Sequence, residues 1–192
     1  MHRSDDAKPR ETLSRRSFLT FGLGAAAATA TTLATSPVEA AVRALPERGL
    51  HLYNVHTGET LKTVYWSQGR YLTKSLVQIN RFLRDHRSGD VAQMDPRLLD
   101  LMLAVHKKFS GKGAIHIISG YRSPASNALL VSQTDGVAHN SLHMAGKAVD
   151  IRIPGQNCNI VGRAAKSLRA GGVGTYPSSN FVHIDTGRVR SW

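Results

Sequence analysis

Three residues of metal-binding types lie in the C-terminal third of the chain: His143, Asp150 and His183. His143 precedes Asp150 by seven positions, and Asp150 lies in the middle of the alternating run 147–153. A carboxylate among apolar neighbours is costly to bury unless it is paired or binds a metal. His183 repeats this pattern, because a β-branched apolar residue flanks it on each side.

Two imidazoles, one carboxylate and an open fourth position make up a catalytic zinc site. Zinc lowers the pKa of its bound water to about 7, which makes that water a usable nucleophile. The alternative is that these are three unrelated polar residues on strands, which is the commoner case for any one of them alone. The spacing therefore indicates a metal site without deciding the question.

Periodicity and capping residues predict the elements that position these side chains. Alternation predicts a hairpin from 50–56 and 61–66, and further strands at 114–119, 147–153 and 180–186. Helices are expected from a cap at Thr73 to about Arg87, from a cap at Asp95 followed by Pro96 to Gly111 or Gly113, from Ser123-Pro124 through Leu130, and from a cap at Asn157 or Asn159 to about Ala170. Gly171-Gly172-Val173-Gly174 is interpreted as a break, and 180–186 as the last strand. The pattern predicts an α+β domain with an antiparallel sheet and flanking helices.

The chain has 192 residues and a formal net charge of +12, which favours a polyanionic partner. No groove-reading motif or set of stacking aromatic residues accompanies the charge, so nucleic acid is not expected as a partner. Cys158 is the only cysteine, which excludes an internal disulfide, and a small buried apolar side chain is its expected role.

The first forty residues have the layout of an export signal. Arg15-Arg16 is followed by Ser-Phe-Leu, an apolar stretch runs from Phe21 to Ala34, and Val38-Glu39-Ala40 offers a small-residue cleavage site. Paired arginines of this kind are typical of the twin-arginine pathway. The alternative is a membrane anchor, but the apolar stretch is shorter than the about 20 residues that a spanning helix needs. We expect a signal at 1–40, a linker at 41–49, a catalytic domain at 50–192, and no membrane insertion once the signal is removed.

Motifs around the three residues resemble the LAS group of zinc peptidases, which includes D-Ala-D-Ala carboxypeptidases, VanX-type dipeptidases and the hedgehog domain. The resemblance rests on residues 119–123 (Ser-Gly-Tyr-Arg-Ser), on 141–150 with its His143 and Asp150, and on Val182-His183. It is closer still to the murein endopeptidase K family, through residues 54–59, 118–123, 169–174 and 180–187. The resemblance implies His143, Asp150 and His183 as zinc ligands, and Arg122 as the residue that stabilises the oxyanion.

One position departs from the LAS pattern. Many members carry a carboxylate as general base three residues before the last zinc histidine, where this chain has Asn180. Asp185, on the same strand face as His183, is either the base or a carboxylate that holds the His183 ring. His139 is a weaker candidate for the base, and Tyr176 either lines the substrate groove or packs.

The expected function is hydrolysis of amide bonds in peptidoglycan stem peptides by a monomeric periplasmic zinc enzyme. By resemblance, the bond lies in a cross-link, and the link between two diaminopimelate residues is a candidate. Two alternatives stay open: a carboxypeptidase or dipeptidase of the same fold, and a wall-binding module that keeps the zinc site without catalysis. The basic tail with Trp192 is expected either to contact glycan or to pack.

Overall fold

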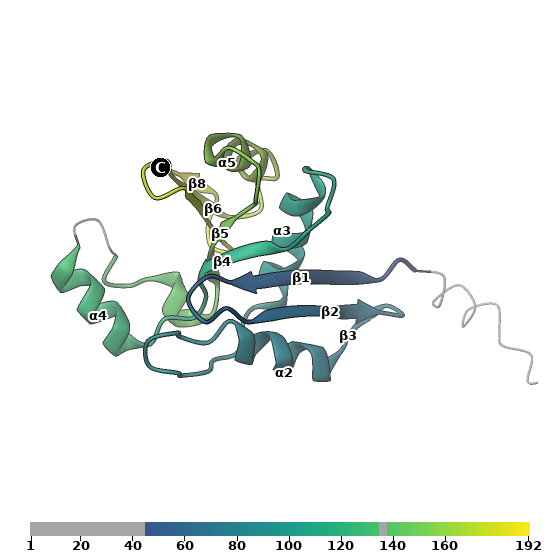
Figure 1. The fold of residues 1–192 in the computed structure, drawn as a ribbon, viewed down its shortest axis with the longest axis horizontal. Helices are drawn as coiled ribbons and strands as arrows, with labels where there is room; N and C mark the ends of the chain where they lie inside the picture. Colours follow the sequence, from purple (N-terminus) through teal and green to yellow (C-terminus); the bar gives the residue numbers. More distant parts are fainter. Residues whose placement is uncertain (1–44, 135–137) are drawn as a thin grey trace, which may run out of the picture. The chain divides into compact units, whose positions relative to one another are not determined.

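The computed structural model describes residues 45–134 and 138–192 (Figure 1). The expected export signal, residues 1–40, and the first part of the expected linker lie outside the described residues. Strand β1 begins at Arg48, inside the range 41–49 that was expected to be a linker. Arg48 pairs with Trp66 of the next strand, and its guanidinium carbon lies 4.3 Å from the centroid of the indole ring. The pairing of Arg48 with Trp66 thus begins the strand two residues before Leu50, where the alternating apolar pattern of the sequence begins.

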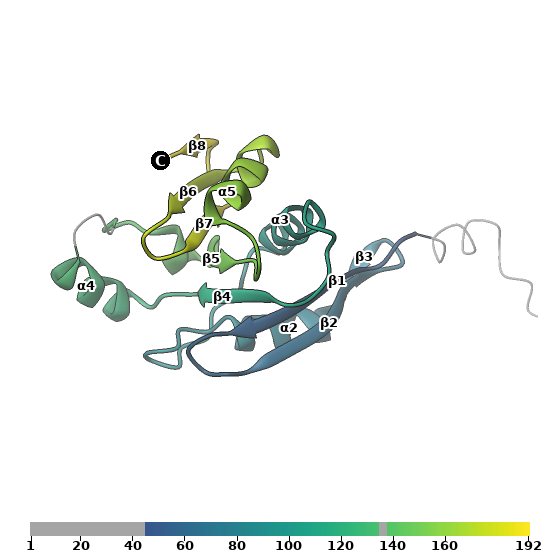
Figure 2. The ribbon, with the colours of Figure 1, turned by 45° about the horizontal axis from the view of Figure 1, so that its top comes forward.

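One sheet of eight strands runs through the described residues, in the order β3-β2-β1-β4-β5-β7-β6-β8 (Figures 1 and 2). The strands are β1 (Arg48–Asn54), β2 (Thr60–Ser67), β3 (Arg70–Tyr71), β4 (Ile115–Ser119), β5 (Ala148–Arg152), β6 (Gly172–Tyr176), β7 (Phe181–Asp185) and β8 (Arg190–Ser191). The predicted α+β class and the β1–β2 hairpin are confirmed. The sheet is mixed rather than antiparallel throughout, because β1 pairs with β4, and β6 with β8, in parallel.

Four helices and one 3-10 turn belong to the described chain: α2 (Thr73–Phe82), α3 (Pro96–Lys107), α4 (Pro124–Gln133), η1 (Leu142–Ala145) and α5 (Cys158–Ser167). The predicted cap at Asp95 is confirmed, Asn157 is the cap of the two alternatives considered for the last helix, and Ser123 caps the helix that it was expected to open. The side chains of Asp95, Ser123 and Asn157 each accept a hydrogen bond from a backbone N–H in the first turn of the helix that follows. None of these helices is long and apolar enough to cross a membrane.

Helix α2 differs from its prediction at both ends. Thr73 is its first helical residue rather than its cap, and the helix ends at Phe82 instead of continuing to Arg87. Asp85 causes the early end, because its carboxylate accepts from the backbone N–H of Arg87 and of Ser123, at 2.9 and 2.8 Å. These bonds turn the chain and tie it to the start of α4.

The glycine-rich segment expected to be a break is a strand, β6, and a further short strand, β8, follows the one expected to be last. Glycine has low strand propensity and no side chain to show alternation, which hides such a strand from pattern analysis. In β6 the side chains alternate between the two faces of the sheet. Thr175 faces α5, where Gly162 leaves room for it, while Gly174 and Tyr176 face the other way.

The main core lies between the sheet and the helices. Its fully buried members include Leu52 of β1, Met102 of α3 and Ile184 of β7, which are all 0% exposed. Cys158 packs in this core at 7% exposure, as its expected structural role requires. Helix α4 contributes no apolar side chain to the core, since the residues that it buries are Ser126 and Asn127. Its contacts with the rest of the domain are therefore polar.

Candidate metal centre

A single row of residues across four strands carries the centre. Ser119 of β4 pairs with Asp150 of β5, Asp150 pairs with His183 of β7, and His183 pairs with Gly174 of β6. Partners in register point to the same face of a sheet. Asp150 and His183 are therefore neighbours because of strand pairing, although 33 positions separate them.

A second row lies two residues further along the strands. Asp185 of β7 adjoins Gly172 of β6 and Arg190 of β8, and a Cβ atom on Gly172 would collide with both side chains. The two glycines of β6 thus leave space above the sheet for large side chains from the strands on either side. The short strand β8 matters for the same reason, since it brings Arg190 to Asp185.

His143 reaches the row from η1. Ser141 caps this turn, and Gly146 ends it with a φ of 65°, a conformation that favours glycine. A Cβ atom on Gly146 would meet the carbonyl oxygen of Gln93, so the turn also needs glycine for space. The Nδ1–H of His143 donates to the carbonyl oxygen of Gly120, at 2.7 Å, which turns Nε2 toward the sheet.

The three predicted ligands converge. His143 Nε2 lies 3.2 Å from His183 Nδ1, and Asp150 Oδ1 lies 2.9 Å from His183 Nδ1 and 3.3 Å from His143 Nε2. Ligand atoms about 3.3 Å apart are what a tetrahedral ion with bonds of about 2.0 Å requires. All three residues are buried.

The outer hydrogen bonds fix which atoms face inward. His143 Nδ1 is bonded to a carbonyl oxygen, and His183 Nε2 lies 3.0 Å from Asp185 Oδ2. In the neutral imidazoles both outer nitrogens carry the hydrogen, so both inner nitrogens present lone pairs beside a carboxylate oxygen. A cation between three acceptors this close together would remove their mutual repulsion, and the residues present therefore fit a divalent metal.

Electrostatics favour the anionic state of the carboxylate. Burial by itself raises the pKa of Asp150, but His143 and His183 outweigh it and hold that pKa below its usual range. Burial by itself lowers the pKa of His183, but Asp150 and Asp185 outweigh it and hold that pKa above its usual range. The pocket thus has the affinity for positive charge that a metal site requires.

Arg122 stands at the edge of the centre. Its Nη2 lies 3.8 Å from Asp150 Oδ2, and its Nη1 donates to Asn127 Oδ1 at 3.2 Å. Its Nε is buried and has no hydrogen-bond partner among the described residues. The amide group of Asn127 also donates to the carbonyl oxygens of Ala138 and His139, so α4 joins Arg122 to the segment beside the cleft.

Asp185 lies on the far side of the His183 ring from the other two ligands. Its side chain is 0% exposed and accepts from Arg190 and from the backbone N–H of Gly172 and Gly187. Burial alone would raise the pKa of Asp185, but His183 and Arg190 keep it below its usual range. Of the two roles left open by the sequence, this position favours holding the ring.

Asn180, the residue at the position of the missing carboxylate, is exposed in a turn with a φ of 51°. Its carbonyl oxygen accepts from Arg152 Nε at 2.7 Å. His139 is exposed and its carbonyl oxygen, rather than its ring, makes the described contact with α4. Neither residue is brought to the three ligands.

A cleft of about 530 Å³ opens over the three ligands. Arg122, Ser141, Tyr176 and Trp192 are among its lining residues, and Asp150 is the only carboxylate in the described part of its lining. Tyr176 thus lines the groove, one of the two roles open to it. Trp192, whose tail was expected either to contact glycan or to pack, also lines the cleft, because pairing of β8 with β6 brings the end of the sequence there.

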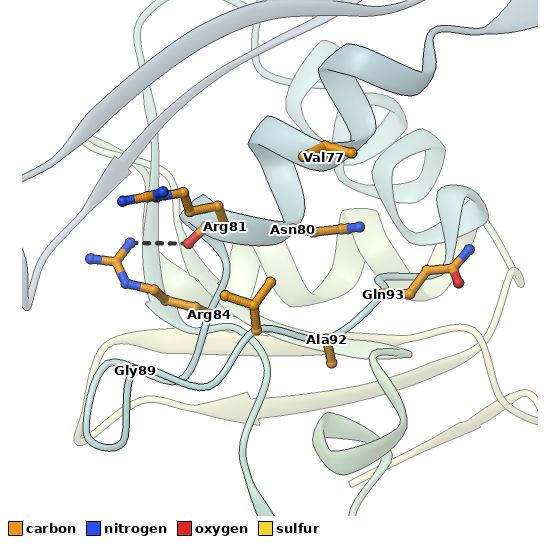
Figure 3. A pocket seen from close by; sticks show the side chains of 8 residues that line it. Val77, Asn80, Arg81, Arg84, Gly89, Ala92 and Gln93 are labelled. Atoms are coloured by element: carbon orange, nitrogen blue, oxygen red, sulfur yellow. Dashed lines mark hydrogen bonds between the residues drawn. The ribbon is translucent and has the colours of Figure 1, made fainter.

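A separate depression of about 570 Å³ lies against α2 (Figure 3). Its lining includes Val77, Arg81 and Arg84, and within residues 45–134 and 138–192 no histidine, cysteine or carboxylate contributes to it. Arg84 is already engaged, since it donates to the carbonyl oxygen of Arg81 and pairs with Glu59 at 2.8 Å. This depression therefore lacks the groups for metal or acid–base chemistry.

The other histidines of the described residues lie apart from the centre. His56 and His86 stack on each other with ring centroids 3.9 Å apart, and His116 lies against Tyr53. His106 is buried in α3 and its Nε2 lies 3.2 Å from the carbonyl oxygen of Lys112. His51 lines a different depression, between β1–β2 and α3.

Comparison with known proteins shows which family the chain resembles. A family model described as peptidoglycan L,D-endopeptidase MepK matches residues 42–192. The peptidoglycan L,D-endopeptidase MepK of Escherichia coli strain K12 is 40% identical over 182 residues, which cover 93% of this chain and 97% of that protein. The probable peptidoglycan L,D-endopeptidase MepK of Haemophilus influenzae is 41% identical over 146 residues, which cover 76% and 78% of the two chains.

Proposed function

Because the chain belongs to the peptidoglycan L,D-endopeptidase MepK family, we propose that it is a zinc peptidase that cuts peptide bonds in the cross-links of peptidoglycan. One observation carries the zinc assignment: three inward-facing acceptors meet within 3.3 Å of one another at the base of a cleft. Imidazole nitrogens with a carboxylate oxygen are a donor set that suits zinc. His143, Asp150 and His183 would hold the ion.

Zinc bound there would supply a Lewis acid and a water of lowered pKa. The residues of the chain do the rest. The carbonyl of Gly120 and the carboxylate of Asp185 keep each histidine in the tautomer that a ligand needs. Arg122 presents a buried, incompletely bonded guanidinium to the cleft, where it stabilises negative charge that develops on the carbonyl oxygen of the scissile bond.

In this proposal Asp185 is a positioning residue, not the general base. Four donor groups surround its carboxylate, the ring of His183 separates it from the other two ligands, and none of it is exposed. A general base must lie within about 3.2 Å of the proton it removes, directly or through one water. Asp185 has no such access to the cleft.

The proposed place of action is the periplasm. A substrate in the cell wall requires export, and Arg15-Arg16 with the apolar stretch after it supplies a signal of the twin-arginine type. We expect replacement of both arginines by lysine to keep the chain in the cytoplasm, as measured by cell fractionation. The monomeric state expected from the sequence stays a prediction.

The test is digestion of purified muropeptides by the zinc-loaded chain, followed by mass spectrometry. Cleavage inside a cross-link, and its loss in His143→Ala, is the expected result. Release of free D-alanine alone would instead identify a carboxypeptidase. Binding to intact sacculi without cleavage of any muropeptide would overturn the enzymatic proposal and favour the wall-binding module.

A further inference from the structure

The last residue of the sequence, Trp192, directly follows β8 and extends the row of the metal centre beyond Gly174 of β6. Its indole ring lies on Gly174, where a Cβ atom would come within 2.6 Å of it. The centroid of its ring is 5.3 Å from that of His183, and the guanidinium of Arg190 lies 4.8 Å from it. The side of the cleft next to His183 is therefore aromatic.

Main-chain bonds hold this aromatic side in place. The backbone N–H of Trp192 donates to the carbonyl oxygen of Val173, and that of Thr175 donates to the carbonyl oxygen of Trp192. Trp192 is nevertheless 49% exposed and lines the cleft. A tryptophan that served only for packing would be buried, whereas a rigid and half-exposed one is typical of a binding surface.

Tyr176 stands beside Trp192 with its hydroxyl group oriented. The indole Nε1–H of Trp192 donates to the Tyr176 oxygen at 2.8 Å, and the phenol ring stacks on Phe181 with centroids 4.5 Å apart. The hydroxyl hydrogen of Tyr176 has no acceptor among the described residues. A phenol whose oxygen already accepts one bond is well prepared to donate its own hydrogen to a ligand.

The charges of the cleft indicate what that ligand is. Arg122 and Arg190 line it. Buried Asp185 balances the charge of Arg190, and Asp150, the only carboxylate in the described lining, faces the two histidines. Arg122, whose Nε has no partner among the described residues, is therefore the positive group that the cleft offers to a ligand. Such a cleft attracts anions. An acceptor with negative charge also forms a stronger bond with a hydroxyl donor than a neutral acceptor does.

We propose that Tyr176 and Trp192 form a substrate subsite for a carboxylate-bearing segment of the stem peptide next to the scissile bond. The Tyr176 hydroxyl donates to the carboxylate, and the exposed indole covers the aliphatic part that bears it. This subsite rests on the proposed function, because it lies beside the same metal centre. It assigns recognition to the C-terminal segment, in addition to the contact of Arg190 with Asp185.

The experiment uses the full chain with Trp66→Phe, which leaves Trp192 as the only tryptophan. Trp192 emission is recorded on rapid mixing, before turnover, with a synthetic stem tetrapeptide that has free carboxylates and with its amidated counterpart. We expect a saturable change with the free acid, and about tenfold weaker apparent affinity for the amide. An emission that is insensitive to both peptides would overturn the subsite.

Two substitutions separate recognition from structure. Tyr176→Phe should raise KM for the acid about tenfold and abolish the preference for acid over amide, with zinc content unchanged. Gly174→Ala should raise KM for both the acid and the amide without altering either aromatic residue, because the added methyl group displaces the indole that covers the aliphatic part. Tyr53→Phe, on a tyrosine that packs on His116, is the matched control.

The two proposals fail in different ways. Cleavage of muropeptides with no response of Trp192, or with an acid preference that survives Tyr176→Phe, refutes the subsite and leaves the activity intact. A specific Trp192 response without any cleavage refutes the activity and leaves the subsite. Loss of bound zinc in Tyr176→Phe would show that the residue is structural and would also overturn the subsite.

Discussion

Replacement of Asp185 by asparagine tests how the metal centre is held. The carboxylate accepts from His183 Nε2 at 3.0 Å and from both terminal nitrogens of Arg190 at 2.7 and 3.1 Å, with no exposure to solvent. An asparagine of the same shape keeps one acceptor oxygen, but its NH₂ group must face a donor. It also removes the charge that balances Arg190.

Two magnitudes follow from this geometry. Removing one partner of a buried ion pair costs about 3 to 5 kcal/mol of unfolding free energy, and we expect the lower end because the Arg190 side chain is 32% exposed. Loss of the group that orients a metal-binding histidine weakens metal affinity about 10- to 100-fold. Urea unfolding of the metal-free chain measures the first effect, and competition with a zinc chelator measures the second.

Asp90→Asn is the matched control, because Asp90 is an exposed loop carboxylate bonded to Ser88. It should change neither quantity. The reasoning is refuted if Asp185→Asn binds zinc as tightly as the parent chain yet loses turnover. That result would mean that Asp185 moves a proton in the reaction, the role that its burial argues against.

Other substitutions probe the remaining parts of the centre. Arg122→Ala should lower kcat about 10²- to 10³-fold with little change in KM or bound zinc, as measured by steady-state kinetics and metal analysis. A positive φ alone costs an alanine about 1 kcal/mol, and the Cβ atom of Gly146→Ala would also meet Gln93, so this variant should lower the unfolding free energy by more than that amount. It should also weaken zinc binding, because the turn that it disturbs carries His143. Burial and the neighbouring His56 lower the pKa of His86 to about 4 in the folded chain. As the pH falls from about 6.5 toward 4, the unfolded chain takes up a proton at His86 before the folded chain does, so the folded chain loses stability. His86→Gln should therefore flatten the pH dependence of stability.

Each of these has a control and a contrary result. Arg122→Lys keeps the positive charge and should retain part of the activity. If Arg122→Lys and Arg122→Ala lose equal amounts of kcat, the planar guanidinium group rather than the charge is the essential feature. Gly155→Ala has a similar φ of 75° but open space around its Cβ, so an equal cost in both glycine variants would refute the clash. A stability profile unchanged by His86→Gln would show that His86 does not contribute to the acid sensitivity.

The sequence by itself indicated the candidate ligands and predicted most of the elements that carry them. Asp150 and His183 could be recognised because each interrupts an apolar alternating strand, and a polar residue there is costly unless it has a function. Asp95, Ser123 and Asn157 could be assigned as caps because capping depends on local hydrogen bonds within one turn. Such features depend on neighbours along the chain.

Only the tertiary structure decided how these residues combine. Strand β6 was hidden because Gly172 and Gly174 show no alternation, and their purpose, space for Arg190 and Trp192, depends on strands that are distant in sequence. The role of Asp185 was open for a similar reason: the same strand face is compatible with a base and with a ring-holding carboxylate. Pairing of β7 with β5 set Asp150 opposite His183 and Ala148 opposite Asp185, so the two candidate ligands adjoin while Asp185 bonds to Gly172 of β6. Register is a property of pairing that no single segment contains.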